Sequence, residues 1–259
     1  FNDTATSEIY TLSLNDALTI LLYKFESESN LNNQEKFDNL QQFVVNDLKK
    51  VDILIKEKLE NKISYIPEVA GHLVKAGGKR IRPMLCLACA RLCNYKGVKH
   101  INLSVCIEFI HTATLLHDDV IDESKKRRGL KTANNIWGNK SSVLVGDFLL
   151  SKSFELMTEI ENIEVLKILS ETSSIIIEGE ISQMLSNRNM STTEDEYLDI
   201  IKSKTAYLFA TASKINSYLM KYPNKYKNAL NSFGMNLGTA FQLIDDLLDY
   251  KAVDRKSVV

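Results

Sequence analysis

The sequence predicts an all-α protein, and three observations carry that prediction. Only 10 glycines and 3 prolines occur among 259 residues, so few turns interrupt the chain. Apolar residues recur at gaps of three and four over long stretches, as they do on one face of an amphipathic helix. No alternating apolar and polar pattern persists for more than a few residues, which disfavours strands. Because several expected helices exceed about 20 residues, the sequence favours a single large bundle.

The expected helices follow one another with short breaks. The Gly77-Gly78 pair is predicted to separate two of them, and a loop is predicted from Gly129 to Asn135. Pro83 fits the first turn of a helix, where its missing N–H does no harm. We expect helices at about 37–62, 83–92, 102–122, 141–158, 163–186, 194–221 and 226–250.

Two regions are predicted along the chain. Residues 1–34 are polar and are interpreted as an N-terminal appendage. Residues 35–259 are interpreted as one domain, which we expect to be truncated at its C-terminus because a bundle of this kind would continue past an apolar helix.

Composition excludes some classes of partner. Hydrophobic residues make up 44% and charged residues 25%, as in ordinary globular proteins, and the net charge is -1. No overall basic field favours nucleic acid, and no apolar run approaches the roughly 20 residues of a membrane-spanning helix. We therefore expect no nucleic acid partner and no transmembrane segment. The compartment, organellar or cytoplasmic, stays open because residues 1–34 show no clear transit peptide.

Three of the four cysteines raise the question of a metal site. Cys86, Cys89 and Cys93 are spaced three and four residues apart, which also places them on one face of a helix. Buried cysteine behaves as a small hydrophobic side chain, so we favour core packing over metal binding.

Two apolar helical runs each contain three aspartates. Within each run the first and last aspartates are four residues apart and share a helix face, where like charges repel. A hard cation such as Mg²⁺ relieves that repulsion and shares its other ligands with water and phosphates. One such run alone is more simply a solvated face, but two favour a common cavity whose cations attract a polyanion. The aspartates are Asp118, Asp119 and Asp122 in the first run and Asp245, Asp246 and Asp249 in the second.

Basic residues gather at three further places. The glycine-led segment 77–83 (GGKRIRP) opens a helix, where backbone amides and the helix dipole favour an anion. The run Lys125-Lys126-Arg127-Arg128 follows the first aspartate run, so it is placed to grip a metal-bound diphosphate. Lys204-Thr205 is a weaker signal that alone would indicate a surface position. Solvated charge is the simpler interpretation of each segment taken by itself.

In combination, these motifs closely resemble the trans-polyprenyl diphosphate synthases, over about residue 37 to the end of the chain. The segment 107–117 is most similar to the long-chain branch, which includes octaprenyl diphosphate synthases. The resemblance implies the isoprenoid synthase fold, with mostly antiparallel helices around a central cavity. The motifs that carry it are GGKRIRP at 77–83, HDDVID at 117–122, Arg127-Arg128, Lys204-Thr205 and FQLIDDLLD at 241–249.

The resemblance also implies roles for individual residues. Lys79, Arg82, His111 and Arg128 would bind the diphosphate of isopentenyl diphosphate. The allylic diphosphate would be contacted by Arg127, Lys204, Thr205 and Gln242. Three Mg²⁺ ions per active site are expected, two held by Asp118 and Asp122 and a third led by Asp245. The expected catalytic set comprises Asp118, Asp119, Asp122, Arg127, Lys204, Asp245, Asp246 and Asp249.

The implied reaction joins isopentenyl diphosphate to an allylic diphosphate and yields a long-chain polyprenyl diphosphate, for example for a quinone side chain. Thr114 and Ala113 lie four and five residues before Asp118 and are small, which predicts a deep tunnel and a long product. A homodimer is expected by resemblance alone.

Four alternatives remain open from the sequence. A shorter-chain synthase making farnesyl or geranylgeranyl diphosphate would share every motif. A terpene cyclase would share the fold but would not need Lys79, Arg82 or the second aspartate run. A His-Asp phosphohydrolase could recruit His72, His117 and Asp118 but leaves the second run unexplained. A non-catalytic subunit would normally show eroded aspartate runs, whereas both are intact here.

Overall fold

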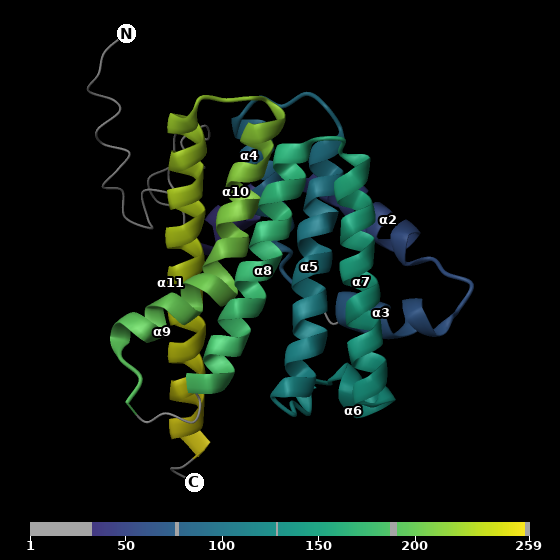
Figure 1. Cartoon of the computed structure of the whole chain (residues 1–259), viewed down its shortest axis with the longest axis vertical. Coiled ribbons are helices and arrows are strands. Elements are labelled where there is room, and N and C mark those ends of the chain that lie inside the picture. The colour runs from purple at the N-terminus through teal and green to yellow at the C-terminus, as the bar shows by residue number, and fades with distance from the viewer. Residues whose placement is uncertain (1–32, 76–77, 128, 187–190, 257–259) are drawn as a thin grey trace. The chain divides into compact units, whose positions relative to one another are not determined.

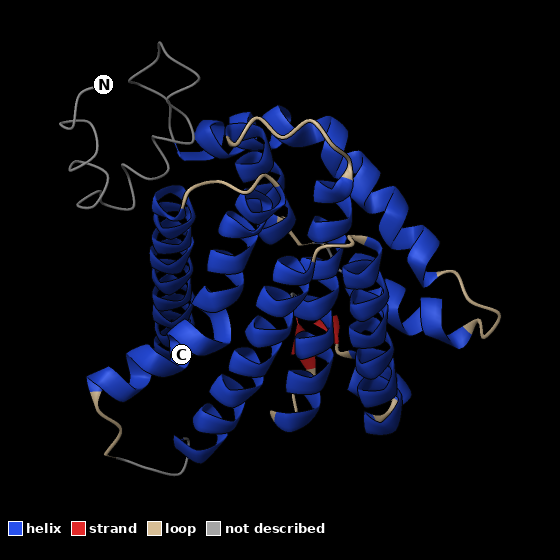
Figure 2. Ribbon diagram, turned by 45° about the horizontal axis from the view of Figure 1, so that its top comes forward, coloured by secondary structure: helices blue, strands red, loops and turns tan. Residues whose placement is uncertain are grey.

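The structure is a computed structural model that describes residues 33–75, 78–127, 129–186 and 191–256. Nearly all of the predicted appendage, residues 1–32, and the predicted ligand Arg128 lie outside the described residues. The chain divides into two compact units, one from Asp38 to Leu166 and the other from Lys167 onward together with the N-terminal residues. The described residues are overwhelmingly helical, which confirms the all-α prediction (Figures 1 and 2).

The unit from Asp38 to Leu166 is organised around one central helix. Helix α5 packs between α4 and α7, and a short two-stranded hairpin follows it. Its elements are α2 (Asn33–Leu59), α3 (Tyr65–Lys75), α4 (Ile81–Leu92), α5 (Lys99–Ile121), β1 (Lys126–Arg127), β2 (Leu130–Lys131), α6 (Ala133–Trp137) and α7 (Asn139–Glu159).

Helix α5 is apolar on most of its circumference, and that is why it lies in the core of this unit. Phe109 and Leu116 are among its fully buried side chains, and each stabilises the fold by about 1.5–3 kcal/mol through the apolar area removed from water. Gly146 of α7 allows close contact with α5: a Cβ there would lie 2.3 Å from His117 Nε2. The helix is thus fixed in place up to its last turn.

From Lys167 onward, the described residues of the second unit form four α-helices, two of them joined by a π-helix. Helix α11 packs against both α10 and the π-helix. Gly234 and Gly238 make this contact close, because an added Cβ would lie 2.5 Å from Ala210 Cα and 2.5 Å from Ala206 Cα respectively. The elements are α8 (Ile163–Ser186), α9 (Glu194–Ile201), the π-helix η4 (Lys202–Ala206), α10 (Tyr207–Leu219) and α11 (Asn224–Lys256).

Two sequence predictions of local structure were wrong. The helix expected over 194–221 is interrupted by the π-helix at Lys202–Ala206. The sequence did not reveal this interruption, because one extra residue in a turn leaves the apolar spacing of three and four almost unchanged. The loop expected over Gly129–Asn135 contains β2 and the start of α6. Strands of two residues and a helix of five are too short to show a period in the sequence.

Helix α3 had no predicted range, and α11 runs six residues past its predicted end; the other helices match their predicted ranges to within a few residues. Pro83 lies in the first turn of α4, as predicted. Within the described ranges, the helices fall short of the length and apolar character that spanning a bilayer requires.

Candidate active site

The first aspartate run forms the C-terminal end of α5. Asp118 is 7% exposed and Asp119 is fully buried, while Asp122 caps the helix and is exposed. A helix C-terminus carries partial negative charge, and the last turn of α5 holds no basic residue. Three carboxylates at this position create a strongly negative potential that favours a cation.

Asp119 is paired with a basic residue within the protein. Its Oδ1 accepts hydrogen bonds from Arg127 Nε at 3.0 Å and Nη2 at 2.8 Å. Its backbone carbonyl accepts two more, from Asn134 Nδ2 at 2.9 Å and from the Ser124 amide at 2.9 Å. Asp119 therefore holds the first strand of the hairpin and the basic Arg127 next to the end of α5.

The far side of the hairpin is anchored by two further residues. His72 Nε2 donates a hydrogen bond to the carbonyl of Lys131 at 2.7 Å, and its ring packs edge-on against Trp137 at 5.2 Å. Thr132 Oγ1 donates to the Ser124 carbonyl at 2.6 Å. His117 Nε2 similarly faces a backbone carbonyl, that of Val143, at 3.2 Å. The contacts of both histidines are structural, which weakens the phosphohydrolase alternative.

A basic site is formed between α4 and the helix that carries the first acids, α5. Arg82 Nη1 donates to His111 Nε2 at 3.0 Å, so this ring nitrogen carries no proton and the neutral ring has its proton on Nδ1. His111 and Asp118 are seven residues apart on α5, which puts them on one face about 10 Å apart along the axis. The structure thus brings together two predicted ligands and aligns them with the predicted metal ligands.

The other two basic residues of segment 77–83 behave differently from Arg82. Lys79 is exposed. Arg80 adopts a left-handed backbone conformation, with φ of 50°, and its guanidinium pairs with Glu108 and lies 3.7 Å from Asp52. Arg80 therefore stabilises the start of α4, while Lys79 and Arg82 remain the candidate anion ligands.

The second aspartate run lies within the long helix α11 and is held by a different set of partners. Tyr197 donates from its hydroxyl to Asp246 Oδ2 at 2.5 Å, and Gln242 Nε2 donates to Asp246 Oδ1 at 2.8 Å. Thr205 Oγ1 in turn donates to Gln242 Oε1 at 2.7 Å. Three of these four residues were predicted from the sequence, and the structure joins them through α9, the π-helix and α11.

Tyr197 remains protonated under all ordinary conditions. Burial, together with the hydrogen bond to the Asp246 carboxylate and its charge, raises the pKa of Tyr197 to about 12. The hydroxyl is therefore a constant hydrogen-bond donor to that carboxylate.

Lys204 and Thr205 are adjacent in the π-helix but point to different helices. The Lys204 ammonium lies 2.6 Å from Glu180 Oε2 and donates to Gln183 Oε1 at 2.7 Å, both on α8. A Cβ at Gly179 would lie 2.8 Å from the Lys204 backbone nitrogen, so this glycine allows α8 to approach the π-helix. A π-turn is frequent at functional sites, and here it separates the directions of two successive polar side chains.

The rest of the second run faces outward within its own unit. Asp245 is exposed, and the position of the Asp249 side chain lies outside the described part of the chain. Four apolar neighbours on α11 are between 42% and 57% exposed, namely Leu243, Ile244, Leu247 and Leu248. Exposure of acids beside bare apolar side chains is unusual for a purely structural helix face.

The two predicted chain-length residues lie in the C-terminal half of α5. Ala113 is buried, and Thr114 is half-buried with its hydroxyl donating to the His111 carbonyl at 2.8 Å. Both therefore lie on the stretch of α5 between the Arg82–His111 pair and Asp118.

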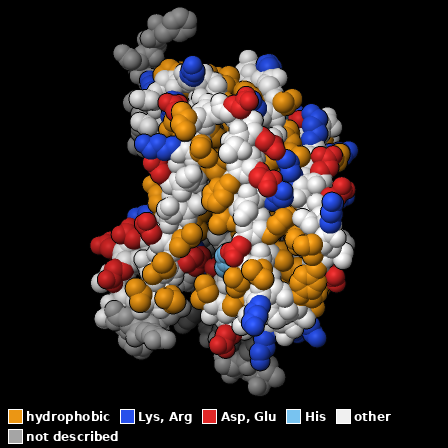
Figure 3. Space-filling view, turned by 45° about the vertical axis from the view of Figure 1, so that its right-hand side comes forward, with side chains coloured by type: hydrophobic (Ala, Val, Ile, Leu, Met, Phe, Trp, Pro, Cys, Tyr) orange, Lys and Arg blue, Asp and Glu red, His pale blue; other side chains and the backbone are white. Residues whose placement is uncertain are grey.

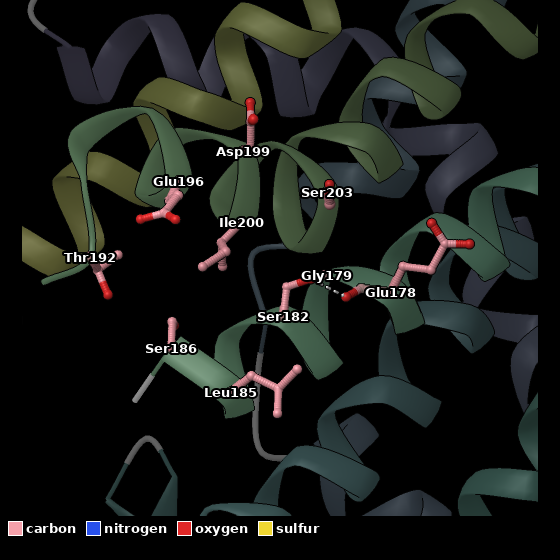
Figure 4. Close-up of a pocket in the computed structure, with 10 residues that line it drawn as sticks. All are labelled: Glu178, Gly179, Ser182, Leu185, Ser186, Thr192, Glu196, Asp199, Ile200 and Ser203. Atoms are coloured by element: carbon pink, nitrogen blue, oxygen red, sulfur yellow. Dashed lines mark hydrogen bonds between the residues drawn. The ribbon is translucent and has the colours of Figure 1, made fainter. Parts of the chain in front are cut away.

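A separate polar cleft of about 480 Å³ lies between α8 and α9 (Figure 4). Ser182 and Ser186 approach it from α8, while Glu196 and Ile200 approach it from α9. Glu196 is occupied in the capping box that begins α9, accepting from the Thr193 amide at 2.8 Å.

The face of the molecule shown in Figure 3 mixes acidic, basic and hydrophobic side chains.

Asp118 and Asp122 fit a magnesium ion that brings most of its own ligands. They offer only oxygen donors, four residues apart at a negative helix end. Among the described residues, no group of three His, Cys, Asp or Glu side chains forms a ready-made metal cage. The carboxylates therefore suit an ion whose remaining ligands are water and phosphate oxygens.

The cysteines are core residues, as predicted. All four are buried and form no disulfide. Burial raises the pKa of the Cys93 thiol to about 11 and raises that of Cys106 further, so neither is a ready thiolate ligand.

Comparison with known proteins shows the family of the chain. Residues 63–257 match the sequence profile of the polyprenyl synthetase family. The chain belongs to this family. The match confirms the resemblance inferred from the motifs, together with the prediction of a prenyltransferase-type enzyme.

The chain is similar to named long-chain synthases. The chain is 43% identical over 215 residues to octaprenyl diphosphate synthase of Escherichia coli, covering 83% of this chain and 67% of that protein. It is 44% identical over 208 residues to the all-trans-nonaprenyl-diphosphate synthase of Rhodobacter capsulatus, covering 80% and 64%.

Solved structures agree with these relatives and confirm the isoprenoid synthase fold. A decaprenyl diphosphate synthase from Rhodobacter capsulatus superposes with a TM-score of 0.81 at 51% identity, covering 83% of this chain and 66% of the other. A polyprenyl synthase from Caulobacter crescentus, complexed with calcium and isoprenyl diphosphate, also gives a TM-score of 0.81, at 42% identity, covering 87% and 67%. The chain thus spans about two thirds of the length of these proteins.

Sequence reasoning missed several partners of the site. No motif surrounded Tyr197, Glu180, Gln183 or Asn134. Each acts through a contact between segments that are distant in sequence. Only a polar side chain within an otherwise amphipathic helix could have hinted at them, and that signal also marks ordinary surface residues.

Proposed function

We propose that the protein condenses isopentenyl diphosphate with an allylic diphosphate, in the trans 1'-4 manner, to make a long-chain polyprenyl diphosphate. The observation that carries the proposal is the arrangement on α5. A basic site, Arg82 of α4 hydrogen-bonded to His111 of α5, lies along the helix that ends in the carboxylates Asp118 and Asp122. One suits a free diphosphate and the other a metal-bound diphosphate, as a reaction between two diphosphates requires.

The carboxylates are proposed to hold Mg²⁺, with three ions per active site. Asp118 and Asp122 would hold two, and Asp245 would lead the third with support from Asp246 and Asp249. The ions would neutralise negative charge on the leaving diphosphate.

Basic and polar residues are proposed to bind the two substrates. Lys79, Arg82, His111 and Arg128 would bind isopentenyl diphosphate. Arg127, Lys204, Thr205 and Gln242 would contact the allylic diphosphate. The Arg127 guanidinium is already oriented by the Asp119 carboxylate, so little freedom remains to be lost when it binds an anion.

In the proposed reaction, the allylic C–O bond breaks and the diphosphate leaves with the bonding electron pair. The double bond of isopentenyl diphosphate attacks the resulting allylic cation and forms a new C–C bond. Loss of a proton from the adjacent carbon restores a double bond, so the chain grows by one isoprene unit. No protein nucleophile is needed. The amide dipole of Gln242, fixed by Thr205 and Asp246, could stabilise the cation.

A long product is supported by two features. Ala113 is buried and small and Thr114 is half-buried, so neither places a bulky side chain on this stretch of α5. The octaprenyl and nonaprenyl synthases to which the chain is similar make long chains by name. We extend the proposal to a quinone side chain as the use of the product and to a homodimer as the assembly.

The proposal is tested by incubating the protein with Mg²⁺, farnesyl diphosphate and radiolabelled isopentenyl diphosphate. Products are dephosphorylated and separated by chain length on reversed-phase plates. We expect labelled polyprenols of about eight to ten isoprene units, which vanish when a chelator removes Mg²⁺. Products of four units or fewer would support the shorter-chain alternative, a hydrocarbon would support a cyclase, and free phosphate alone would contradict the proposal.

A further inference from the structure

The contacts of Asp246 single out a residue that no motif marked. Both oxygens of this carboxylate accept hydrogen bonds from uncharged donors, Tyr197 at 2.5 Å and Gln242 at 2.8 Å. Hydrogen bonds to a carboxylate are roughly twice as strong as those between neutral groups. The carboxylate is therefore held in one orientation from two sides.

The two donors come from different elements and differ in what they achieve. Gln242 is one turn away on the same helix, so its bond to Asp246 cannot hold α11 against another element. Tyr197 lies on α9, forty-nine residues away in sequence. Its hydroxyl is thus a side-chain link between α9 and the aspartate run of α11.

The Tyr197 link is the first of two side-chain contacts from this segment to α11. Eight residues further along the chain, Thr205 donates to Gln242, so the segment from α9 into the π-helix contacts α11 at two successive turns. Two anchor points on one helix face fix its rotation about its own axis. Asp245, which precedes Asp246, points in a direction set by that rotation because successive helical residues are about 100° apart.

We infer that Tyr197 is a positioning residue that acts through Asp246 to orient Asp245 toward its cation. The inference rests on the proposed function of the second aspartate run. On this view Asp246 serves mainly as the acceptor that fixes α11, and Asp245 is the carboxylate proposed to meet the ion.

The inference is tested with Tyr197→Phe, which removes one oxygen and keeps the ring. Tyr226→Phe is the matched control, because Tyr226 lies on α11 and is 57% exposed. Loss of a hydrogen bond to a charged group should lower kcat about tenfold and raise the Mg²⁺ concentration for half-maximal rate severalfold. KM for isopentenyl diphosphate should stay unchanged, and Tyr226→Phe should match the parent protein in all three. Equal behaviour of the two variants would overturn the inference.

Two measurements that need no turnover keep this test separate from that of the proposed function. In hydrogen–deuterium exchange, peptides from α9 should exchange faster in Tyr197→Phe than in the parent, while peptides from α5 should not change. Binding of Mn²⁺ in the presence of inorganic diphosphate, followed by the loss of the free-ion electron paramagnetic resonance signal, should weaken severalfold. If the parent protein makes no prenyl product but these two differences appear, the proposed function fails and the positioning role stands. Absence of both differences refutes the positioning role whatever the activity.

A double-variant cycle checks that Tyr197 acts through Asp246. Adding Tyr197→Phe to Asp246→Ala should cause no further loss of Mn²⁺ affinity, because the acceptor is already gone. Additive losses would show that the hydroxyl acts by another route.

Discussion

The two aspartate runs resemble each other in sequence and differ in structure. The first ends a buried helix, with Asp118 and Asp119 enclosed and a charged partner, Arg127, on the middle residue. The second lies inside a long helix, with Asp245 exposed and uncharged partners, Tyr197 and Gln242, on the middle residue. In both runs the middle aspartate is engaged within the protein, while an outer aspartate is proposed to hold metal. Within each run, the middle aspartate thus has a structural contact and the outer ones are the proposed metal ligands.

The largest expected effect is on turnover, and it tests whether an aspartate of the buried first run contributes more to catalysis than one of the exposed second run. Asp118→Ala should lower turnover by about a thousandfold or more, since charge acts more strongly at a water-excluded site. Asp245→Ala should cost roughly ten- to a hundredfold, because it is proposed to serve one ion rather than two. Steady-state assays and circular dichroism of both variants provide the check. Near-normal turnover in Asp118→Ala with intact helix content would eliminate its metal role.

The next effect concerns stability and compares two ion pairs, Arg127–Asp119 at the first run and Lys204–Glu180 in the second unit. Arg127→Met leaves the fully buried Asp119 carboxylate without its ion pair and should lower the free energy of unfolding by about 3 kcal/mol. Lys204→Met leaves Glu180, which is 17% exposed and nearer to water, and should cost only about 1 kcal/mol. Urea denaturation measures both. Lys125→Met, an exposed change on the same loop, should be nearly neutral, and an equal loss there would show that Asp119 is not specifically paired.

A change between the cationic pair and the first run should alter the product rather than the fold. Ala113→Phe places a ring in a buried position and should shift the product to shorter chains, at a stability cost of about 1–3 kcal/mol. Thr114→Phe is the companion variant at a half-buried position and should cost less stability. Chromatography of the dephosphorylated products gives the answer. An unchanged product distribution in both folded variants would separate these residues from control of chain length.

The smallest effect lies away from both runs and tests the core of the first unit. Burial lowers the pKa of His100 below its usual 6.5, although nearby Asp47 opposes this, and His100 Nδ1 has no hydrogen-bond partner among the described residues. The folded state therefore binds a proton less readily than the unfolded state, so this contribution to stability is present above pH 6.5 and is lost as pH falls through the lowered pKa.

His100→Gln should accordingly flatten the loss of stability on acidification in this window, by less than the change in Arg127→Met. Unfolding curves recorded at several pH values between about 7 and 5 measure it. A parent and a variant with parallel pH profiles would show that His100 is not the group that titrates.

Much of this protein was determined by its sequence alone. The scarcity of glycine and proline and the spacing of apolar residues determine long helices, because both act within a few turns of chain. The motifs around Arg82, Asp118, Thr205 and Asp246 indicated the family for a similar reason, since its chemistry needs those residue types at fixed local spacings.

Tertiary structure decided which residues each motif contacts. Asp119 and Asp246 look equivalent in sequence, yet one pairs with a guanidinium eight residues away and the other with a phenol forty-nine residues away. The π-turn points Lys204 toward α8 and Thr205 toward α11, and Gly179 lets α8 approach it closely. Such contacts join segments far apart along the chain, and local residue preferences hold no information about which distant side chain will meet them.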